Sequence, residues 1–209
     1  MSDLTTVLPE DLLILCTPGG GGRIRLPAYF DYAVAGAVLA ELVLAGAVRL
    51  DSGRAVLIDP GHVFPHPALT EAVSALPPSA TTPRGASLSS CIQRLRRKRA
   101  AQPYLDTLVA CGEFLCIRVR VLGIFRVTRY FYFGISERRD RCAAISVVMH
   151  SPSTAHRRNR NLATLAATVG LPDHGSRRLP RHVTRDLIRT DPIATAVASA
   201  IQSARGRKS

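Results

Sequence analysis

The densest cluster of charged side chains lies in residues 91–99, and its arginines could bind phosphate. The cluster holds five basic side chains, Arg94, Arg96, Arg97, Lys98 and Arg99. If the stretch is helical, Arg94, Arg97 and Lys98 share one face, because side chains three and four apart are neighbours on a helix. Arginine's planar fork matches the oxygens of a phosphate group. We therefore expect an anion site with these three as direct contacts and Arg96 and Arg99 as alternates, against the alternative of a merely solvated face.

Residue types that could catalyse a reaction are present, but their spacing matches no catalytic motif. The glycine run at 19–22 lacks the lysine and hydroxyl residue that follow in a phosphate-binding loop, so a turn is expected. His62 and His66 are four apart, but Pro65 interrupts a helix between them, which makes a shared metal ion improbable. The sequence contains no Gly-x-Ser-x-Gly and no His-Glu-x-x-His. We expect a protein that is not an enzyme and that holds no metal ion and no cofactor.

Positive charge also dominates the chain as a whole. The sequence has 28 Lys and Arg against 15 Asp and Glu, a net charge of +13, and its only lysines are Lys98 and Lys208. A GC-rich genome can enrich arginine without any functional reason, but this net charge favours partners that carry phosphate. A second basic cluster, at residues 138–141, contains its own acid and is expected to lie at the surface.

Length and composition favour a single domain over residues 1–209, with a flexible loop at about 77–88 and a basic tail at 205–209. The chain is 46% hydrophobic, which is enough for a core. Five cysteines without a Cys-x-x-Cys pair favour a reducing compartment. No signal peptide is evident, and the most apolar stretch, 33–45, is too short to span a bilayer. We expect a cytoplasmic protein, peripherally associated with a membrane.

Helical periodicity and capping residues predict a mainly α fold with a helical-bundle core, surrounding amphipathic helices and one or two short β-hairpins. An Ala-rich helix that begins after Pro27 and ends near Gly46 is apolar on all sides, so it belongs inside the core. Asp191 followed by Pro192 predicts the start of the last helix. Other helices are expected at about 9–15, 68–76, 91–99, 105–111, 138–149, 154–169 and 181–188.

Two hairpins are predicted, each after a helix that ends in glycine. The first covers residues 48–58, with a turn at Asp51-Ser52-Gly53. The second covers residues 115–133 and is longer and more apolar. Because a two-stranded ribbon alone is marginal in water, something must cover its apolar face. We expect Val121, Leu122, Ile124 and Phe125 to be an anchor in lipid or a contact between two copies of the chain, unless the hairpin packs on its own domain.

Four segments together carry a family resemblance: residues 8–15 (LPEDLLIL), 31–42 (DYAVAGAVLAEL), 108–112 (LVACG) and 121–125 (VLGIF). In order and spacing they resemble the Golgi phosphoprotein 3 family, and particularly its shorter bacterial members. The resemblance implies a mainly helical domain, an apolar hairpin that touches the membrane, and a basic pocket for the head group of phosphatidylinositol 4-phosphate.

The pocket that the resemblance implies is only half present in this sequence. Leu26 and Ala35 stand where eukaryotic members of the family have a tryptophan and an arginine. Two further basic positions of the family fall at Lys98 and Ala101 by ungapped counting, or at Arg96 and Arg99, or at Arg94 and Arg97, after a small shift. The resemblance therefore implies anionic head groups without strict selectivity for one phosphoinositide.

Three functions remain open from the sequence, and peripheral lipid binding is favoured. A helix followed by a two-stranded wing, twice over, is also typical of winged-helix proteins that bind nucleic acid. A scaffold that binds only protein, with a hairpin that dimerises, is the third. The aromatic residues of the second hairpin lie among aliphatic ones, which suits an acyl interface better than a nucleic-acid groove.

Overall fold

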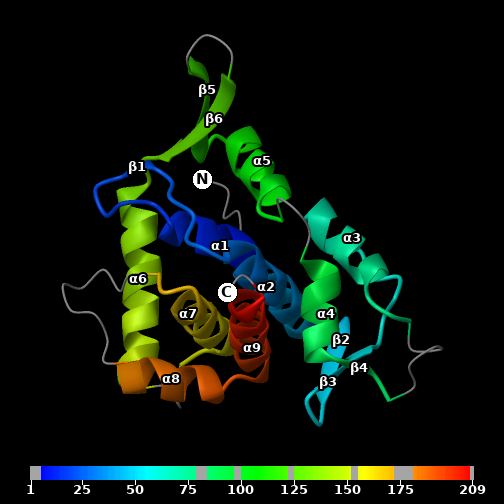
Figure 1. Cartoon of the computed structure of the whole chain (residues 1–209). Helices are drawn as coiled ribbons and strands as arrows, with labels where there is room; N and C mark the ends of the chain where they lie inside the picture. Colours follow the sequence, from blue (N-terminus) through cyan, green and yellow to red (C-terminus); the bar gives the residue numbers. More distant parts are fainter. Residues whose placement is uncertain are drawn as a thin grey trace.

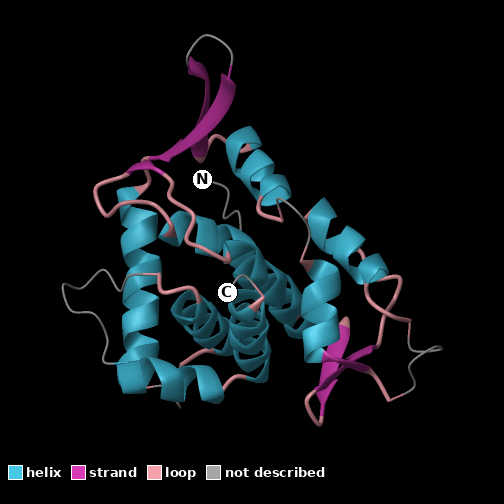
Figure 2. Cartoon of the chain, viewed as in Figure 1, coloured by secondary structure: helices cyan, strands magenta, loops and turns pink. Residues whose placement is uncertain are grey.

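Helices dominate the fold, and the expected class is confirmed. The computed structural model describes residues 6–78, 84–96, 100–121, 125–151, 155–171 and 181–207. Within these ranges the chain forms nine helices and two three-stranded antiparallel sheets (Figures 1 and 2). The two sheets lie far apart, at opposite ends of the helical bundle (Figure 2).

The Ala-rich helix is the centre of the bundle, as the sequence predicts. It is α2 (Phe30–Leu44), and all but two of its residues are buried. Helices from both ends of the chain pack on it: α1 (Leu8–Leu15), α4 (Leu88–Leu95), α7 (Arg157–Thr168) and α9 (Pro192–Gly206). A Cβ atom at Gly36 would lie 2.6 Å from Val197 and 2.7 Å from Leu165. Glycine at this position therefore lets α7 and α9 approach α2 closely.

The last helix begins where the capping pattern predicts. The Asp191 carboxylate accepts hydrogen bonds from the backbone N–H groups of Ile193 (2.8 Å) and Ala194 (3.1 Å), and Pro192 occupies the first turn. Asp191 also accepts a hydrogen bond from the hydroxyl group of Thr164 (3.0 Å), on α7. One residue thus starts α9 and fixes it to its neighbour. The remaining helices are α3 (Pro67–Ala75), α5 (Gln102–Ala110), α6 (Ile135–His150) and α8 (Arg181–Arg189).

Both predicted hairpins form, and each gains a short third strand. In the first sheet β2 (Val48–Asp51) and β3 (Arg54–Leu57) are joined by Ser52 and Gly53, both with positive φ, and β4 (Ala86–Ser87) pairs with β3. The strand β4 falls inside the segment predicted as a loop, of which residues 79–83 lie outside the described ranges. In the second sheet β1 (Gly22–Arg23) pairs with β6 (Phe125–Tyr132), which pairs with β5 (Phe114–Val121).

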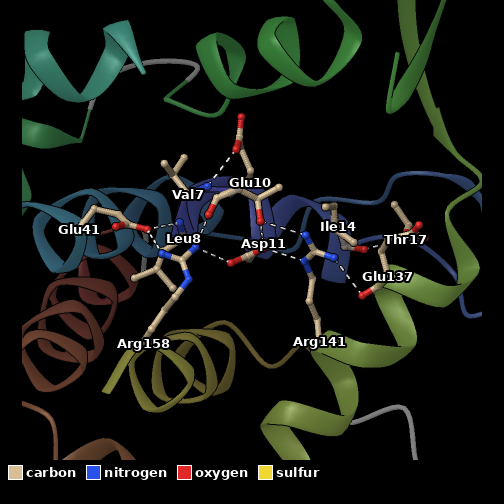
Figure 3. A network of polar contacts seen from close by, with 11 residues as sticks. Val7, Leu8, Glu10, Asp11, Ile14, Thr17, Glu41, Glu137, Arg141 and Arg158 are labelled. Carbon is tan, nitrogen blue, oxygen red and sulfur yellow. Dashed lines mark hydrogen bonds and ion pairs between the residues drawn. The ribbon is translucent and has the colours of Figure 1, made fainter. Parts of the chain in front are cut away.

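A network of ion pairs joins four helices of the bundle (Figure 3). Arg158 on α7 contacts the Asp11 carboxylate on α1 (2.8 Å) and the Glu41 carboxylate on α2 (2.6 Å). Arg141 on α6 contacts the second Asp11 oxygen at 2.6 Å. The two carboxylates are nearly buried, with side chains 7% and 11% exposed. The network holds together helices that are far apart in the sequence.

The expectation that residues 138–141 lie at the surface is confirmed for Arg139 and Asp140, which are exposed, and is wrong for Arg138 and Arg141. Arg138 is buried, and its Nε donates a hydrogen bond to the backbone carbonyl of Thr17 (2.8 Å). Arg141 is only 18% exposed. Both partners come from the N-terminal segment, more than a hundred residues away, so the charge pattern around residue 140 could not reveal them.

A buried histidine at the start of α3 makes the stability of the fold depend on pH. The Nδ1 atom of His66 accepts a hydrogen bond from the Ala68 N–H (3.2 Å), which requires that nitrogen to be unprotonated. Burial lowers the pKa of His66. A histidine with a lowered pKa favours folding above its ordinary value of about 6.5 and loses that contribution as pH falls towards the lowered value.

We therefore expect the midpoint of urea unfolding to fall more steeply between pH 7.5 and pH 5.5 in the parent than in His66→Asn, which keeps a capping acceptor but does not titrate. Glu10 Oε1 lies 3.6 Å from Nε2 of His66, and burial raises the pKa of Glu10. Its contribution has the opposite sign, since a raised carboxyl pKa favours folding at lower pH, and it is present in both proteins. Equal slopes in the two proteins would contradict the assignment.

Candidate functional site

The second hairpin presents two chemically different faces. In an antiparallel pair, directly opposed residues point to the same side of the ribbon, and successive pairs alternate. The first face, which we call the apolar face, contains five apolar residues and Arg129: Leu115 with Phe131, Ile117 with Arg129, and Val119 with Val127. The second, polar face consists of Phe114 with Tyr132, Cys116 with Tyr130, Arg118 with Thr128, and Arg120 with Arg126.

Aliphatic side chains of the apolar face are open to solvent. Leu115 is 52% exposed and Ile117 is 38% exposed, and Phe133, just beyond the ribbon, is 64% exposed. Of the predicted anchor, Leu122 and Ile124 lie outside the described residues, and only the backbone of Val121 and Phe125 is described, as a directly opposed pair. Exposed apolar side chains gathered on one face are typical of an interaction surface.

Two buried aromatic residues and a hydrogen bond to α5 hold the base of the hairpin against the bundle. The Phe114 and Tyr132 rings stack with centroids 4.9 Å apart, and both are buried. Burial also raises the pKa of Tyr132 to about 12, so the phenol stays neutral. The side-chain amide of Gln102, on α5, donates a hydrogen bond to the Tyr130 hydroxyl (2.7 Å). The ribbon therefore extends from a fixed base, away from the helices (Figure 1).

The predicted basic helix is shorter than the sequence suggested. It is α4, which ends at Leu95, because Arg96 has an extended backbone (φ −73°, ψ 96°). Leu88, Cys91, Ile92 and Leu95 form its buried face. On a longer helix, Lys98 and Arg99 would continue this face into the core, where unpaired charges are unfavourable.

The predicted helix 91–99 is wrong in its length, and the face that Arg94, Arg97 and Lys98 were expected to share depends on that longer helix, so the anion site there stays a prediction. Arg97, Lys98 and Arg99 lie outside the described residues. Arg94 is exposed in the last turn of α4. The sequence contained a signal that the helix ends near Leu95, because basic residues occupy the positions three and four after it, where the buried face would continue.

Arg96 points towards the start of α2. Its guanidinium contacts the Asp31 carboxylate (3.0 Å) and lies 4.7 Å from the centre of the Tyr32 ring. At the same end of α2, the Arg205 guanidinium of α9 lies 5.5 Å from the Tyr29 ring centre. Arg205 was predicted only as part of a basic tail, and the structure brings it to this end of the central helix. Lys208 lies outside the described residues.

Leu26 and Ala35, the two residues that differ from the pocket implied by the family resemblance, have different surroundings. Leu26 is 47% exposed, just before α2, so an aromatic side chain at this position would reach solvent. Ala35 is fully buried inside the bundle. Of the other implied positions, Ala101 is also buried, and Arg96 is paired with Asp31. Position 35 of this chain is therefore a core position rather than a pocket position.

Little in the described ranges resembles a catalytic or metal centre. No three His, Cys, Asp or Glu side chains gather there as potential metal ligands. His62 pairs with Asp59 (3.2 Å), while His66 caps α3, so the two histidines have separate structural roles. None of the described helices has the length and apolarity needed to cross a bilayer.

Comparison with known proteins gives one family for nearly the whole chain. The family model described as Golgi phosphoprotein 3 (GPP34) matches residues 8–204. This range includes the central helix, both hairpins and α9. No curated protein matches the sequence significantly.

Proposed function

Because this chain belongs to the Golgi phosphoprotein 3 (GPP34) family, we propose that it is a cytoplasmic, peripheral membrane protein that binds anionic phospholipid head groups. By family resemblance the head group is similar to phosphatidylinositol 4-phosphate. The proposed role is binding without catalysis, and the proposed partner is the membrane surface itself.

The observation that carries this proposal is the division of the second hairpin into an apolar face with exposed side chains and a polar face that carries arginines. Leu115 and Ile117 are open to solvent on one side, and three arginines of the other side are exposed. A ribbon of this kind suits the boundary between acyl chains and head groups. Each basic residue near an anionic surface contributes on the order of 1 kcal/mol, and inserted apolar area adds to this.

Co-sedimentation with vesicles tests the proposal. We expect no binding to phosphatidylcholine alone, and binding once phosphatidylserine or phosphatidylinositol 4-phosphate is included. Added salt should weaken this binding only in part, because salt screens charges but not apolar insertion. Absence of binding to every anionic vesicle would contradict the proposal.

Duplex DNA added as a competitor tests the nucleic-acid-binding alternative, and the oligomeric state of the protein tests the scaffold alternative. If DNA removes the protein from vesicles and binds it more tightly than lipid does, a nucleic-acid-binding function is favoured instead. If the protein forms a dimer through the 115–133 hairpin and binds neither vesicles nor DNA, the scaffold function is favoured.

A further inference from the structure

A polar groove lies between α5 and the polar face of the second hairpin. Its volume is about 1080 Å³. The consecutive elements α5 and the second hairpin line it, and the polar residues among its walls are Gln102, Asp106, Arg118, Arg126, Thr128 and Tyr130. A second hollow of about 390 Å³ on the hairpin shares Arg118 and Arg126 with the groove and adds Arg120. The two hollows thus form one continuous basic region.

The arginines of this region are placed where they repel each other. Arg120 lies directly opposite Arg126 across the ribbon, and Arg118 lies on the same face, one pair further from the tip. Directly opposed like charges destabilise a strand pair. All three are exposed, and none of them forms an ion pair with another described residue. A bound anion would relieve this repulsion.

A hydrogen bond already orients one neutral donor of the groove, the Tyr130 hydroxyl. The Gln102 amide donates hydrogen bonds to both the Asp106 carboxylate (2.7 Å) and the Tyr130 hydroxyl (2.7 Å). Because the Tyr130 oxygen accepts this bond, its own proton remains available for a ligand. Thr128, opposite Arg118, provides a second hydroxyl. Two guanidinium groups and two hydroxyl groups form a donor set that suits a phosphate group.

The acid of the groove restricts what else the ligand can carry. Asp106 lies on the α5 side, while the arginines lie on the hairpin side. A ligand whose phosphate contacts the arginines would bring its adjacent atoms towards this carboxylate. A hydroxyl or ammonium group could donate to it there, whereas an anionic group at that position would be repelled, so the second phosphate of a head group similar to phosphatidylinositol 4-phosphate would have to point away from Asp106.

We propose that this groove binds the phosphate of a lipid head group that also carries a hydroxyl or ammonium group, with Arg118 and Arg126 as its main contacts. The inference rests on the proposed membrane function, and it assigns other residues than the basic ones predicted at 94–99. A lipid source is favoured over a free phosphate compound, because the opposite face of the same ribbon exposes Leu115 and Ile117, which would lie against acyl chains.

The test compares Arg118→Gln/Arg126→Gln with Arg49→Gln/Arg185→Gln on phosphatidylcholine vesicles that contain phosphatidylglycerol. Arg49 and Arg185 are exposed and lie on β2 and α8, so both double variants lose the same charge. We expect vesicle affinity to fall about 30-fold in the groove variant, since each arginine at an anionic surface contributes about fivefold. The vesicle affinity of the control variant should fall only a few-fold. Circular dichroism of both variants verifies the fold.

Two chemically matched lipids test the role of Asp106. A soluble phosphate compound tests whether the bound phosphate belongs to a lipid. Phosphatidylmethanol has the charge of phosphatidylglycerol but no hydroxyl group, so it should bind more weakly, and Asp106→Asn should remove the difference. Soluble glycerol 3-phosphate should not displace the parent from vesicles. If it does, the groove takes a free phosphate compound and the lipid assignment is overturned.

Failure of this inference is distinguishable from failure of the proposed function. If the parent binds no anionic vesicle, the membrane function itself fails. If the parent binds but the groove variant loses no more affinity than its control, the groove is not the site and the membrane function stands. If binding to duplex DNA depends on Arg118 and Arg126 and exceeds binding to vesicles, the lipid assignment is also overturned.

Discussion

Arg158→Ala is expected to lower the free energy of unfolding by about 3 kcal/mol, the low end of the range for removing one partner of a buried ion pair. The substitution would leave the carboxylates of Asp11 and Glu41 without their shared cation. Both are nearly buried, so water cannot fully replace it. For a chain of this length the loss corresponds to a decrease in melting temperature of roughly 6–12 °C.

The geometry around Arg158 explains why one side chain matters this much. Its two terminal nitrogens contact different carboxylates, and Nη2 also donates to the backbone carbonyl of Thr6. Glu41 in turn accepts a hydrogen bond from the Leu8 N–H (2.6 Å), at the start of α1. Burial acts to lower the pKa of Arg158, but the charges of Glu41 and Asp11 together outweigh it, and the pKa is raised.

Two variants test this account of the network. Arg157→Ala removes a charge from an exposed neighbour on the same helix, and should change stability by about 0.5 kcal/mol or less. Arg158→Lys keeps the charge but not the fork that spans two carboxylates, so its stability should lie between those of the parent and Arg158→Ala. Thermal and urea unfolding measure all three. If Arg158→Ala is no less stable than Arg157→Ala, the network does not stabilise the fold.

Leu115→Asp/Ile117→Asp is expected to weaken binding to anionic vesicles roughly 100-fold, through lost apolar insertion and added repulsion from the lipid charge. The loss should persist at high salt, because apolar insertion is not screened. Both positions are exposed on the apolar face, so the fold should tolerate the change. Vesicle co-sedimentation over a range of salt concentrations measures the effect.

A matched pair of exposed aliphatic residues at the other end of the molecule serves as the control. Ile58 is 50% exposed and Val63 is 77% exposed, and both follow β3 in the first sheet. Ile58→Asp/Val63→Asp adds the same two charges and should lower vesicle affinity only slightly, through weak long-range repulsion from the lipid charge. Equal losses in both double variants would show that charge alone governs binding and would contradict an apolar anchor.

Sedimentation velocity on the same variants addresses the alternative that a second copy of the chain covers the apolar face. If the parent is a dimer and Leu115→Asp/Ile117→Asp is a monomer, with vesicle affinity weakened only through lost avidity, the face is a protein interface. A parent that remains monomeric supports contact with lipid.

Local sequence patterns predicted the elements whose residues interact mainly with near neighbours. The Ala-rich run predicted α2 and its central position, and Asp191-Pro192 predicted the start of α9. Alternation after Gly112 predicted the second hairpin. The predicted helix at 91–99 was wrong in its bounds, although the basic residues after Leu95 contained the information that the helix ends there.

The candidate site was predicted only in part, because the angle at which α5 packs against the second hairpin forms the groove, and no pattern within either element reveals that angle. Arg118 was recognised as part of an alternating strand, but nothing local placed Gln102 and Asp106 across a groove from it. The pairing of Arg96 with Asp31 crosses 65 positions. The basic segment at 94–99 remains a prediction, since Arg97, Lys98 and Arg99 lie outside the described residues.

By itself the sequence determined the helical class, the central helix, the two hairpins and the excess of positive charge, since each follows from periodicity, capping or composition over short stretches. Only the tertiary structure decided which charges are paired in the interior and which line an open groove. Arg158 and Arg118 have the same side chain. The first lies against two nearly buried carboxylates, and the second lines an open groove without an ion-paired acid among the described residues. The role of an arginine depends on the acids and the solvent around it, and packing between distant segments determines both.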